Sequence, residues 1–182
     1  MSARLVRPPD PIGGLPYRIV FVCTGNICRS PMAEVITRSL AVTTTLEDGT
    51  TLDRHVAVSS AGTSPWHEGE PMHPGAAKAL ARGGFPRHAH VAHHFPTTGL
   101  GGYDLMVALD RSHGETLRSL GADPARLFLL RSFDPAAGAA ADVPDPYYGD
   151  DDTFAECRDM IAAACLGLVA SLAAHWDSLP AA

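Results

Sequence analysis

Short apolar runs alternate along the chain with longer segments whose apolar residues recur at helical spacing. Four runs are expected to contribute strands: 20–22, a run near 55–58, 105–109 and 127–130. Four segments are expected to form helices: 30–40, 74–82, 111–120 and 153–176. Alternating strands and helices predict an α/β fold in which helices cover both faces of a parallel sheet. We therefore expect a three-layer, doubly wound, four-stranded parallel sheet.

Individual residues mark several of the expected helix ends. Pro74 suits a first helical turn, and Gly83 and Gly84 suit the end of the same helix. In the last helix, Thr153 is followed three residues later by Glu156, which is the pattern of a capping box. These residues predict the helix limits independently of the apolar spacing.

The composition is that of one globular domain, which we expect at 17–182. A net charge of −6 argues against nucleic acid as a partner. No apolar run approaches the ~20 residues that cross a membrane, and the proline-containing N-terminus has no apolar core of a signal peptide. We interpret residues 1–16 as a flexible extension and expect a monomeric, cytoplasmic protein without a membrane partner.

The most informative segment is Cys-Thr-Gly-Asn-Ile-Cys-Arg-Ser at 23–30, between the first expected strand and helix. At such a turn, successive backbone N–H groups can converge on one point, and the following helix adds its positive end. Gly25 and Asn26 tolerate the positive φ of a tight loop. The resulting field favours the thiolate of Cys23, and the planar guanidinium of Arg29 can grip two phosphate oxygens. These residues predict cleavage of a phosphate ester through a phosphocysteine.

The remaining cysteines are expected to differ in role. Cys157 and Cys165 lie on an apolar helical pattern and are expected in the core. Cys28 shares the loop with Cys23, and two interpretations stay open: a reversible Cys23–Cys28 disulfide that protects the nucleophile, or a structural thiol. Four cysteines in a chain of this size do not indicate a secreted disulfide framework.

The stretch from Phe21 to Glu34 resembles the phosphate-binding loop of the low-molecular-weight protein tyrosine phosphatase family. Later segments are similar to further landmarks of that family in the same order: 60–66, 109–112, 130–135 and 142–149. The resemblance covers nearly the whole chain and is greatest to actinobacterial members. It implies the family's fold and the hydrolysis of phosphotyrosine and aryl phosphates. We expect no metal and no cofactor.

The resemblance also implies roles for individual residues. The phosphate-binding loop would consist of Thr24, Gly25, Asn26, Ile27, Cys28, Arg29 and Ser30. Asp145, in the Asp-Pro-Tyr segment, would protonate the leaving group and then activate water, joining Cys23 and Arg29 as the catalytic residues. From the residues alone, four neighbouring aspartates are competitors: Asp142, Asp150, Asp151 and Asp152.

Further residues would support the loop. By resemblance, Ser30 would donate a hydrogen bond to the sulfur of Cys23. Asn26 would adopt a left-handed conformation, held by Ser60 and His90. His93 stands where the family usually carries arginine, so the contribution of that arginine is not carried over.

The resemblance implies four residues that wall the substrate slot: Ile27, Trp66, Tyr147 and Tyr148. A deep slot between aromatic side chains would let phosphotyrosine reach the sulfur while phosphoserine falls short. Ordinary packing is the alternative for Trp66 and Tyr147. Members that act on phosphoarginine carry threonine at the position of Ile27, so Ile27 favours phosphotyrosine. Expected partners are phosphotyrosine proteins, inorganic phosphate as product inhibitor, and a cognate tyrosine kinase that phosphorylates Tyr147 or Tyr148.

Three rival functions are weighed against the phosphatase. A thiol-coupled arsenate reductase of the same fold needs two further cysteines in a mobile segment, and residues 82–102 hold none. A metal-binding module would use the nearby histidines His88, His90, His93 and His94, although scattered surface histidines are commoner than zinc sites. A non-catalytic phosphotyrosine binder is disfavoured because no member of the catalytic set is missing.

Overall fold

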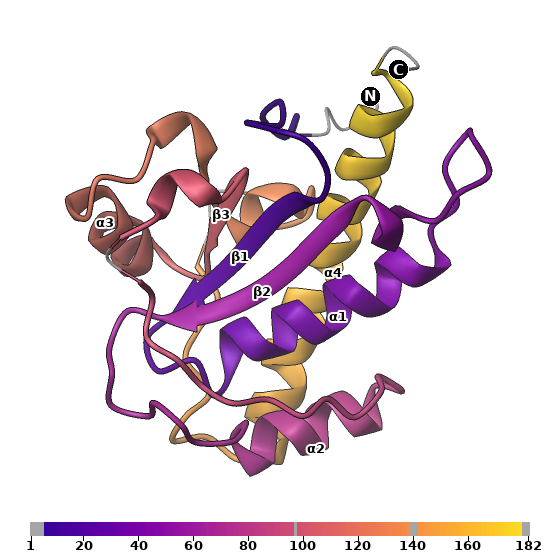
Figure 1. The fold of residues 1–182 in the computed structure, drawn as a ribbon. Helices are drawn as coiled ribbons and strands as arrows, with labels where there is room; N and C mark the ends of the chain where they lie inside the picture. The colour runs from indigo at the N-terminus through magenta and orange to yellow at the C-terminus, as the bar shows by residue number, and fades with distance from the viewer. Residues whose placement is uncertain (1–5, 97, 139–141, 180–182) are drawn as a thin grey trace.

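The computed structural model describes residues 6–96, 98–138 and 142–179. Four parallel strands form a sheet in the order β2-β1-β3-β4. The strands are β1 (Tyr17–Cys23), β2 (Val56–Gly62), β3 (Leu105–Ala108) and β4 (Leu127–Leu129). The main helices are α1 (Arg29–Thr43), α2 (Pro74–Arg82), α3 (Arg111–Ser119) and α4 (Asp151–Asp177). Figure 1 shows α1 and α4 on one side of the sheet and α3 on the other, which confirms the expected three layers.

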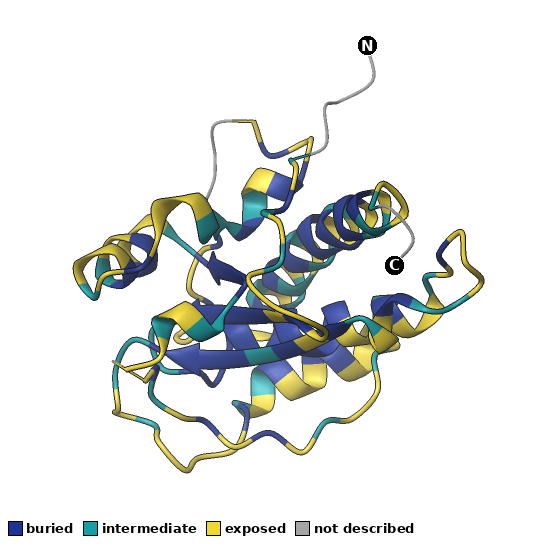
Figure 2. Ribbon diagram, turned by 45° about the horizontal axis from the view of Figure 1, so that its top comes forward, coloured by how far each residue is buried: buried dark blue, intermediate teal, exposed yellow. Residues whose placement is uncertain are grey.

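Both faces of β1 are buried, as its apolar sequence predicts. Ile19 and Phe21 belong to a core cluster shared with α1 and α4, whereas Val20 and Val22 belong to a second cluster that includes Leu117 of α3. Because successive side chains of a strand point to opposite faces, only an unbroken apolar run can fill both clusters. Figure 2 shows this buried sheet between helices with exposed outer faces.

The end of β1 is the point where the connections diverge. The chain runs from β1 through α1 to β2 on one side, and then crosses to β3 on the other side of β1. In doubly wound sheets, ligands bind at such a switch point, beyond the carboxyl ends of the strands. Cys23 is the last residue of β1 and therefore lies at this edge.

All the expected strands and helices are present, but several of them begin or end at other residues than expected. β2 continues past the expected run to Gly62, and Leu130 begins a 3-10 turn (Leu130–Phe133) instead of ending β4. The prediction of a capping box at Thr153 is wrong. α4 begins at Asp151, and the side chain of Asp150 accepts a hydrogen bond from the Thr153 backbone N–H at 3.0 Å. Aspartate is as good an N-cap as threonine, and its charge also complements the helix dipole.

Helix α4 is more apolar than the sequence analysis allowed. It has 27 residues, and an 18-residue window has a mean hydropathy of 1.6, enough by length and composition to cross a membrane. Within the described structure, 44% of that window is buried, and α1 and α2 pack against the helix. Cys157 and Cys165 lie in this contact and are buried, as expected. The helix is thus accounted for as a core helix.

The N-terminal extension is described from residue 6, and residues 1–5 lie outside the described part. Residues 6–16 form no helix or strand, but they contact the domain. The Tyr17 hydroxyl donates to the Pro9 carbonyl at 3.0 Å, and Arg126 donates to the Asp10 carbonyl at 3.0 Å. The backbone N–H of Ile12 donates to Asp104 at 2.7 Å. The described part of the extension is therefore attached at several points.

Candidate active site

The loop of residues 23–30 curls beyond the carboxyl end of β1 and leads directly into α1. Asn26 adopts φ 56°, the only positive φ of a non-glycine residue in the described ranges. The loop also lies against the end of β2, where a β-carbon on Gly62 would be 2.7 Å from the carbonyl oxygen of Thr24. The backbone N–H of Thr63 donates to the Cys23 carbonyl at 2.8 Å. Glycine at the end of β2 therefore permits this close approach.

Cys23 is buried at the base of this loop. Its Sγ lies 3.1 Å from the hydroxyl oxygen of Ser30, so the expected contact between these two residues is present. All four cysteines are free. Burial, followed by the nearby sulfur of Cys23, raises the pKa of the Cys28 thiol well above its ordinary value. Burial also raises the pKa of Cys157 to about 12. Both groups therefore remain thiols at neutral pH.

Asn26 is the centre of the network that holds the loop. Its side-chain N–H₂ donates to Ser30 and to Ser60, both at 2.9 Å. Its backbone carbonyl oxygen lies 2.6 Å from Nε2 of His90. This Nε2 must be the donor, because a carbonyl oxygen can only accept. The backbone N–H of His93 donates to Asn26 Oδ1 at 3.0 Å. The structure thus brings Asn26, Ser60 and His90 together as expected, and His93 joins through its backbone.

Arg29 is buried and held on one side by two acceptors. Its Nη1 donates to Asp110 at 2.8 Å and to the Val143 carbonyl at 3.0 Å. Its Nη2 donates to Asp145 at 3.0 Å. The Nε is buried and has no hydrogen-bond partner among the described residues. The guanidinium is therefore fixed through Nη1, and its Nε can donate to an anion in the loop.

Asp110 orients Arg29, a role that was not expected from the sequence. It caps α3 by accepting from the backbone N–H of His113 at 3.0 Å, and it accepts from Ser112 at 2.6 Å. Burial alone would raise the pKa of Asp110, but these hydrogen bonds, with His113 and Arg29, bring its pKa below the ordinary value. Asp110 is thus a carboxylate at neutral pH, opposite Arg29.

His113 is a second residue that the sequence analysis missed. Its Nε2 lies 2.9 Å from the hydroxyl of Thr24 in the loop. Its Nδ1 lies 3.0 Å from Asp110 Oδ1 but outside hydrogen-bonding geometry. Burial, only partly opposed by Asp110, lowers the pKa of His113 to about 4. The ring is therefore neutral at neutral pH. His113 contacts the loop through this ring and Asp110 through its backbone N–H.

This neutral histidine predicts a pH-dependent stability. An unfolded histidine titrates near 6.5 and the folded one near 4, so between these values only the unfolded chain holds the proton. Stability is then lost as pH falls from about 6.5 to about 4, by on the order of 3 kcal/mol from His113. His113→Gln, which cannot titrate, should reduce this loss in urea unfolding measured at a series of pH values. An unchanged pH dependence in the variant would contradict the assignment.

Asp145 lies across the loop from Cys23, on the segment that precedes α4. Its side chain is 51% exposed, and its Oδ1 accepts from the backbone N–H of Tyr147 at 3.2 Å. The competing aspartates do not line the cavity around Cys23. Asp142 pairs with Arg111 at 3.1 Å, and Asp150 caps α4. Of the five candidate aspartates, Asp145 is thus the one that lines the cavity.

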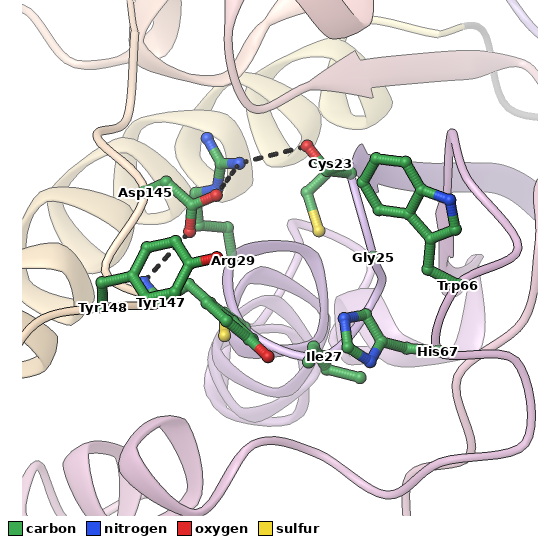
Figure 3. Close-up of a pocket in the computed structure, with 11 residues that line it drawn as sticks. Cys23, Gly25, Ile27, Arg29, Trp66, His67, Asp145, Tyr147 and Tyr148 are labelled. Carbon is green, nitrogen blue, oxygen red and sulfur yellow. Dashed lines mark hydrogen bonds and ion pairs between the residues drawn. The ribbon is translucent and has the colours of Figure 1, made fainter.

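A cavity of about 250 Å³ opens above Cys23 and is lined by the loop and by both flanking segments. Figure 3 shows Tyr147 and Tyr148 on one side and Trp66 on the other. Ile27 also lines the cavity and is buried, whereas Tyr148 is 97% exposed. All four expected wall residues line this cavity.

His67 also lines the cavity and was missed. A β-carbon on Gly25 would lie 2.6 Å from Cδ2 of its ring, so the ring covers the loop directly. Its Nδ1 is 2.8 Å from Glu70, and its ring centroid is 5.9 Å from that of Tyr147. Its position next to Trp66 was the only available signal.

The four histidines considered as a metal module do not converge as one set. His94 lies 3.2 Å from the Thr63 carbonyl, and the exposed His93 lies 3.3 Å from the Val91 carbonyl. His88 and His90 approach Glu34 instead. Burial lowers the pKa of His90, which favours the neutral ring seen in its hydrogen bond to Asn26.

Comparisons with known proteins identify the family. The model of the low molecular weight phosphotyrosine protein phosphatase family matches residues 18–178. The low molecular weight protein-tyrosine-phosphatase of Streptomyces coelicolor is 48% identical over 160 residues, covering 86% of this chain and 93% of its own. Low molecular weight protein-tyrosine phosphatase A of Mycobacterium tuberculosis is 46% identical over 154 residues, covering 84% and 90%. The expected resemblance to actinobacterial members is confirmed.

Solved structures show the same fold. The crystal structure of YfkJ from Bacillus subtilis matches with a TM-score of 0.75 and 34% identity, covering 87% of this chain and 95% of its own. The YwlE arginine phosphatase, in a mutant with a phosphorylated active-site serine, matches with a TM-score of 0.70 and 31% identity, covering 85% and 95%. From its match to the family model over residues 18–178, the chain belongs to the low molecular weight phosphotyrosine protein phosphatase family.

Proposed function

We propose that this chain hydrolyses phosphotyrosine in proteins through a phosphocysteine formed on Cys23. The observation that carries the proposal is one cavity lined by Cys23, Arg29 and Asp145 together, with aromatic side chains at its walls. A nucleophile, an anion-binding guanidinium and a proton donor thus face the same space.

In the first step, the thiolate of Cys23 attacks phosphorus while the bond from phosphorus to the tyrosine oxygen breaks. Asp145, protonated at this stage, gives its proton to the leaving phenolate. The loop N–H groups and Arg29 hold the three equatorial oxygens, where negative charge gathers in the transition state. Arg29 offers its Nε, which has no partner in the described part of the chain, to this group, and Asp110 orients the guanidinium through Nη1.

In the second step, water attacks the phosphorus of the phosphocysteine and the bond from phosphorus to sulfur breaks. Asp145, now ionised, accepts the proton of the attacking water. The sulfur leaves as a thiolate and accepts a hydrogen bond from Ser30, which lies 3.1 Å away. The product is inorganic phosphate, which is proposed to inhibit by occupying the same loop.

Substrate choice is proposed to follow from reach and from Ile27. A phosphorylated ring spans the distance from the rim at Trp66 and Tyr148 to the sulfur, whereas the shorter phosphoserine does not reach it. Ile27 presents an apolar side chain where the phosphoarginine-specific members carry threonine. Ile27 thus disfavours phosphoarginine as the substrate. The arsenate reductase function is disfavoured because Cys28, Cys157 and Cys165 are all buried.

A panel of peptides with one sequence and different phosphorylated residues tests this proposal. We expect kcat/KM for phosphotyrosine to exceed that for phosphoserine by on the order of 10²-fold or more, because misplacement of the phosphorus disrupts in-line attack. Ile27→Thr should shift the preference toward phosphoarginine. Equal rates on phosphoarginine and phosphotyrosine with the unaltered protein would contradict the proposed specificity.

Phosphotyrosine proteins are the proposed partners. Tyr148 is almost fully exposed at the rim of the cavity, which supports the proposal that a tyrosine kinase can phosphorylate it. The monomeric state and the cytoplasmic location stay predictions.

A further inference from the structure

Behind the phosphate loop, three potential metal ligands come together from separate segments. Glu34 of α1 and His90 are buried, with exposed fractions of 6% and 8%, and His88 beside them is partly buried. One ligand atom from each residue lies within 4.8 Å of the other two. His88 Nε2 and Glu34 Oε1 are 3.6 Å apart.

Each of these residues can offer one atom to a metal, although on Glu34 that atom, Oε1, is also paired with Arg38 at 2.8 Å. Glu34 accepts from the Ser60 hydroxyl through Oε2 at 2.6 Å, which leaves Oε1 facing His88. His90 donates through Nε2 to the Asn26 carbonyl, so its Nδ1 keeps a lone pair. A metal-binding histidine usually binds the ion through one ring nitrogen and donates the N–H of the other to an acceptor such as a backbone carbonyl.

We propose that Glu34, His88 and His90 bind a divalent transition-metal ion of the zinc class. Imidazole and carboxylate ligands suit Zn²⁺, whose bonds of about 2.0–2.2 Å place tetrahedral ligand atoms roughly 3.3 Å apart. The 3.6 Å between His88 Nε2 and Glu34 Oε1 is already close to this spacing, and His88 lies on a loop. A surface cavity of about 570 Å³, lined in part by His88 and His90, gives a hydrated ion access and leaves room for water as the fourth ligand.

The site is connected to the phosphate loop through both of its buried ligands. Glu34 holds Ser60, Ser60 accepts from Asn26, and His90 donates to the carbonyl of the same Asn26. A metal on Glu34 and His90 therefore fixes both arms of the network that keeps Asn26 at positive φ. Since the ion binds the folded chain, it also raises the thermal stability by mass action.

Arg38 competes with the metal for Glu34. Its Nη2 lies 2.8 Å from Glu34 Oε1 and also donates to the Val58 carbonyl at 2.6 Å. An ion at the site must replace or share this ion pair. Arg38→Gln removes the competing charge, so we expect it to bind Zn²⁺ more tightly than the parent.

Zinc titration of the full-length, untagged protein tests the proposal. The background variant is Cys23→Ser, because the thiol of Cys23 would itself bind zinc. Burial raises the pKa of Cys157 and Cys165 to about 12, so these remain thiols and compete poorly. Calorimetry should then show one Zn²⁺ per chain, and thermal unfolding should show a higher Tm with zinc. Absence of binding at micromolar Zn²⁺ would overturn the proposal.

A matched pair of histidine variants, each made on the Cys23→Ser background, locates the ion. Loss of even an outer-shell partner costs about 10–100-fold in metal affinity, so His88→Ala should weaken zinc binding at least about tenfold. His93→Ala is the control, because this neighbouring exposed histidine faces Val91 instead of Glu34. Unchanged affinity in His88→Ala, or an equal loss in His93→Ala, would mean scattered surface binding and refute the site. Phosphatase activity enters none of these readouts, so the result is independent of the proposed function.

Discussion

Replacing Cys23 by serine is expected to abolish phosphotyrosine hydrolysis, with kcat lowered by on the order of 10⁵-fold or more. The serine hydroxyl is nearly the same size, but it remains protonated at neutral pH and is a poor nucleophile. The loop N–H groups and Arg29 are unaffected, so inorganic phosphate should still bind. Steady-state kinetics on a phosphotyrosine peptide, together with phosphate binding by calorimetry, measures both effects.

Cys165→Ala provides the control for this experiment. Cys165 is fully buried in α4, away from the cavity, and burial raises its pKa to about 12. Its removal should cost some stability and leave kcat close to that of the parent. A Cys23→Ser protein that is folded, binds phosphate and still turns over at a rate near the parent's would exclude Cys23 as the nucleophile.

Asp145→Asn should lower kcat by about 10²–10⁴-fold on aryl phosphates whose leaving groups need a proton. Substrates with acidic phenols should lose less, because their phenolates leave without protonation. The same change removes a carboxylate that lies 3.0 Å from Nη2 of Arg29. Phosphate should therefore inhibit the variant more strongly than the parent. Rates across a series of substituted phenyl phosphates, with phosphate inhibition constants, measure the two opposite effects.

The matched control is Asp142→Asn. Asp142 lies in the same segment, but it pairs with Arg111 and does not line the cavity. Any loss of kcat in the Asp142→Asn variant should therefore depend little on the leaving group. If both variants lost the same factor on every substrate, general acid catalysis by Asp145 would be refuted.

Much of the fold could be predicted because local sequence carries it. The unbroken apolar run of β1 predicts burial on both faces, and Pro74 with the glycines after Arg82 predicts the limits of α2. The start of α4 could not be read reliably, because several residues in succession are good caps. Its use of Asp150 depends on how the preceding loop enters the helix.

The candidate site divides in the same way. Cys23, Arg29 and the loop between them are contiguous, so their spacing, the adjoining strand and helix, and the family resemblance could predict them as one site. Asp110 and His113 are more than 80 residues along the chain from the loop groups that they contact. They reach the loop because β3 ends at the same edge of the sheet as β1. The available signal was that polar residues directly follow a buried strand. This signal can be interpreted only once the order of the strands in the sheet is known.

Trapping the phosphorylated enzyme shows whether the phosphoryl group is transferred to the sulfur of Cys23. Asp145→Asn protein is mixed with an aryl phosphate whose leaving group needs no proton, quenched in acid within milliseconds, and digested for mass spectrometry. We expect one phosphoryl group on the peptide that contains Cys23, attached to that sulfur and absent from Cys23→Ser protein. Turnover with no phosphoryl group on Cys23 at any time, or with the group on another residue, would contradict it.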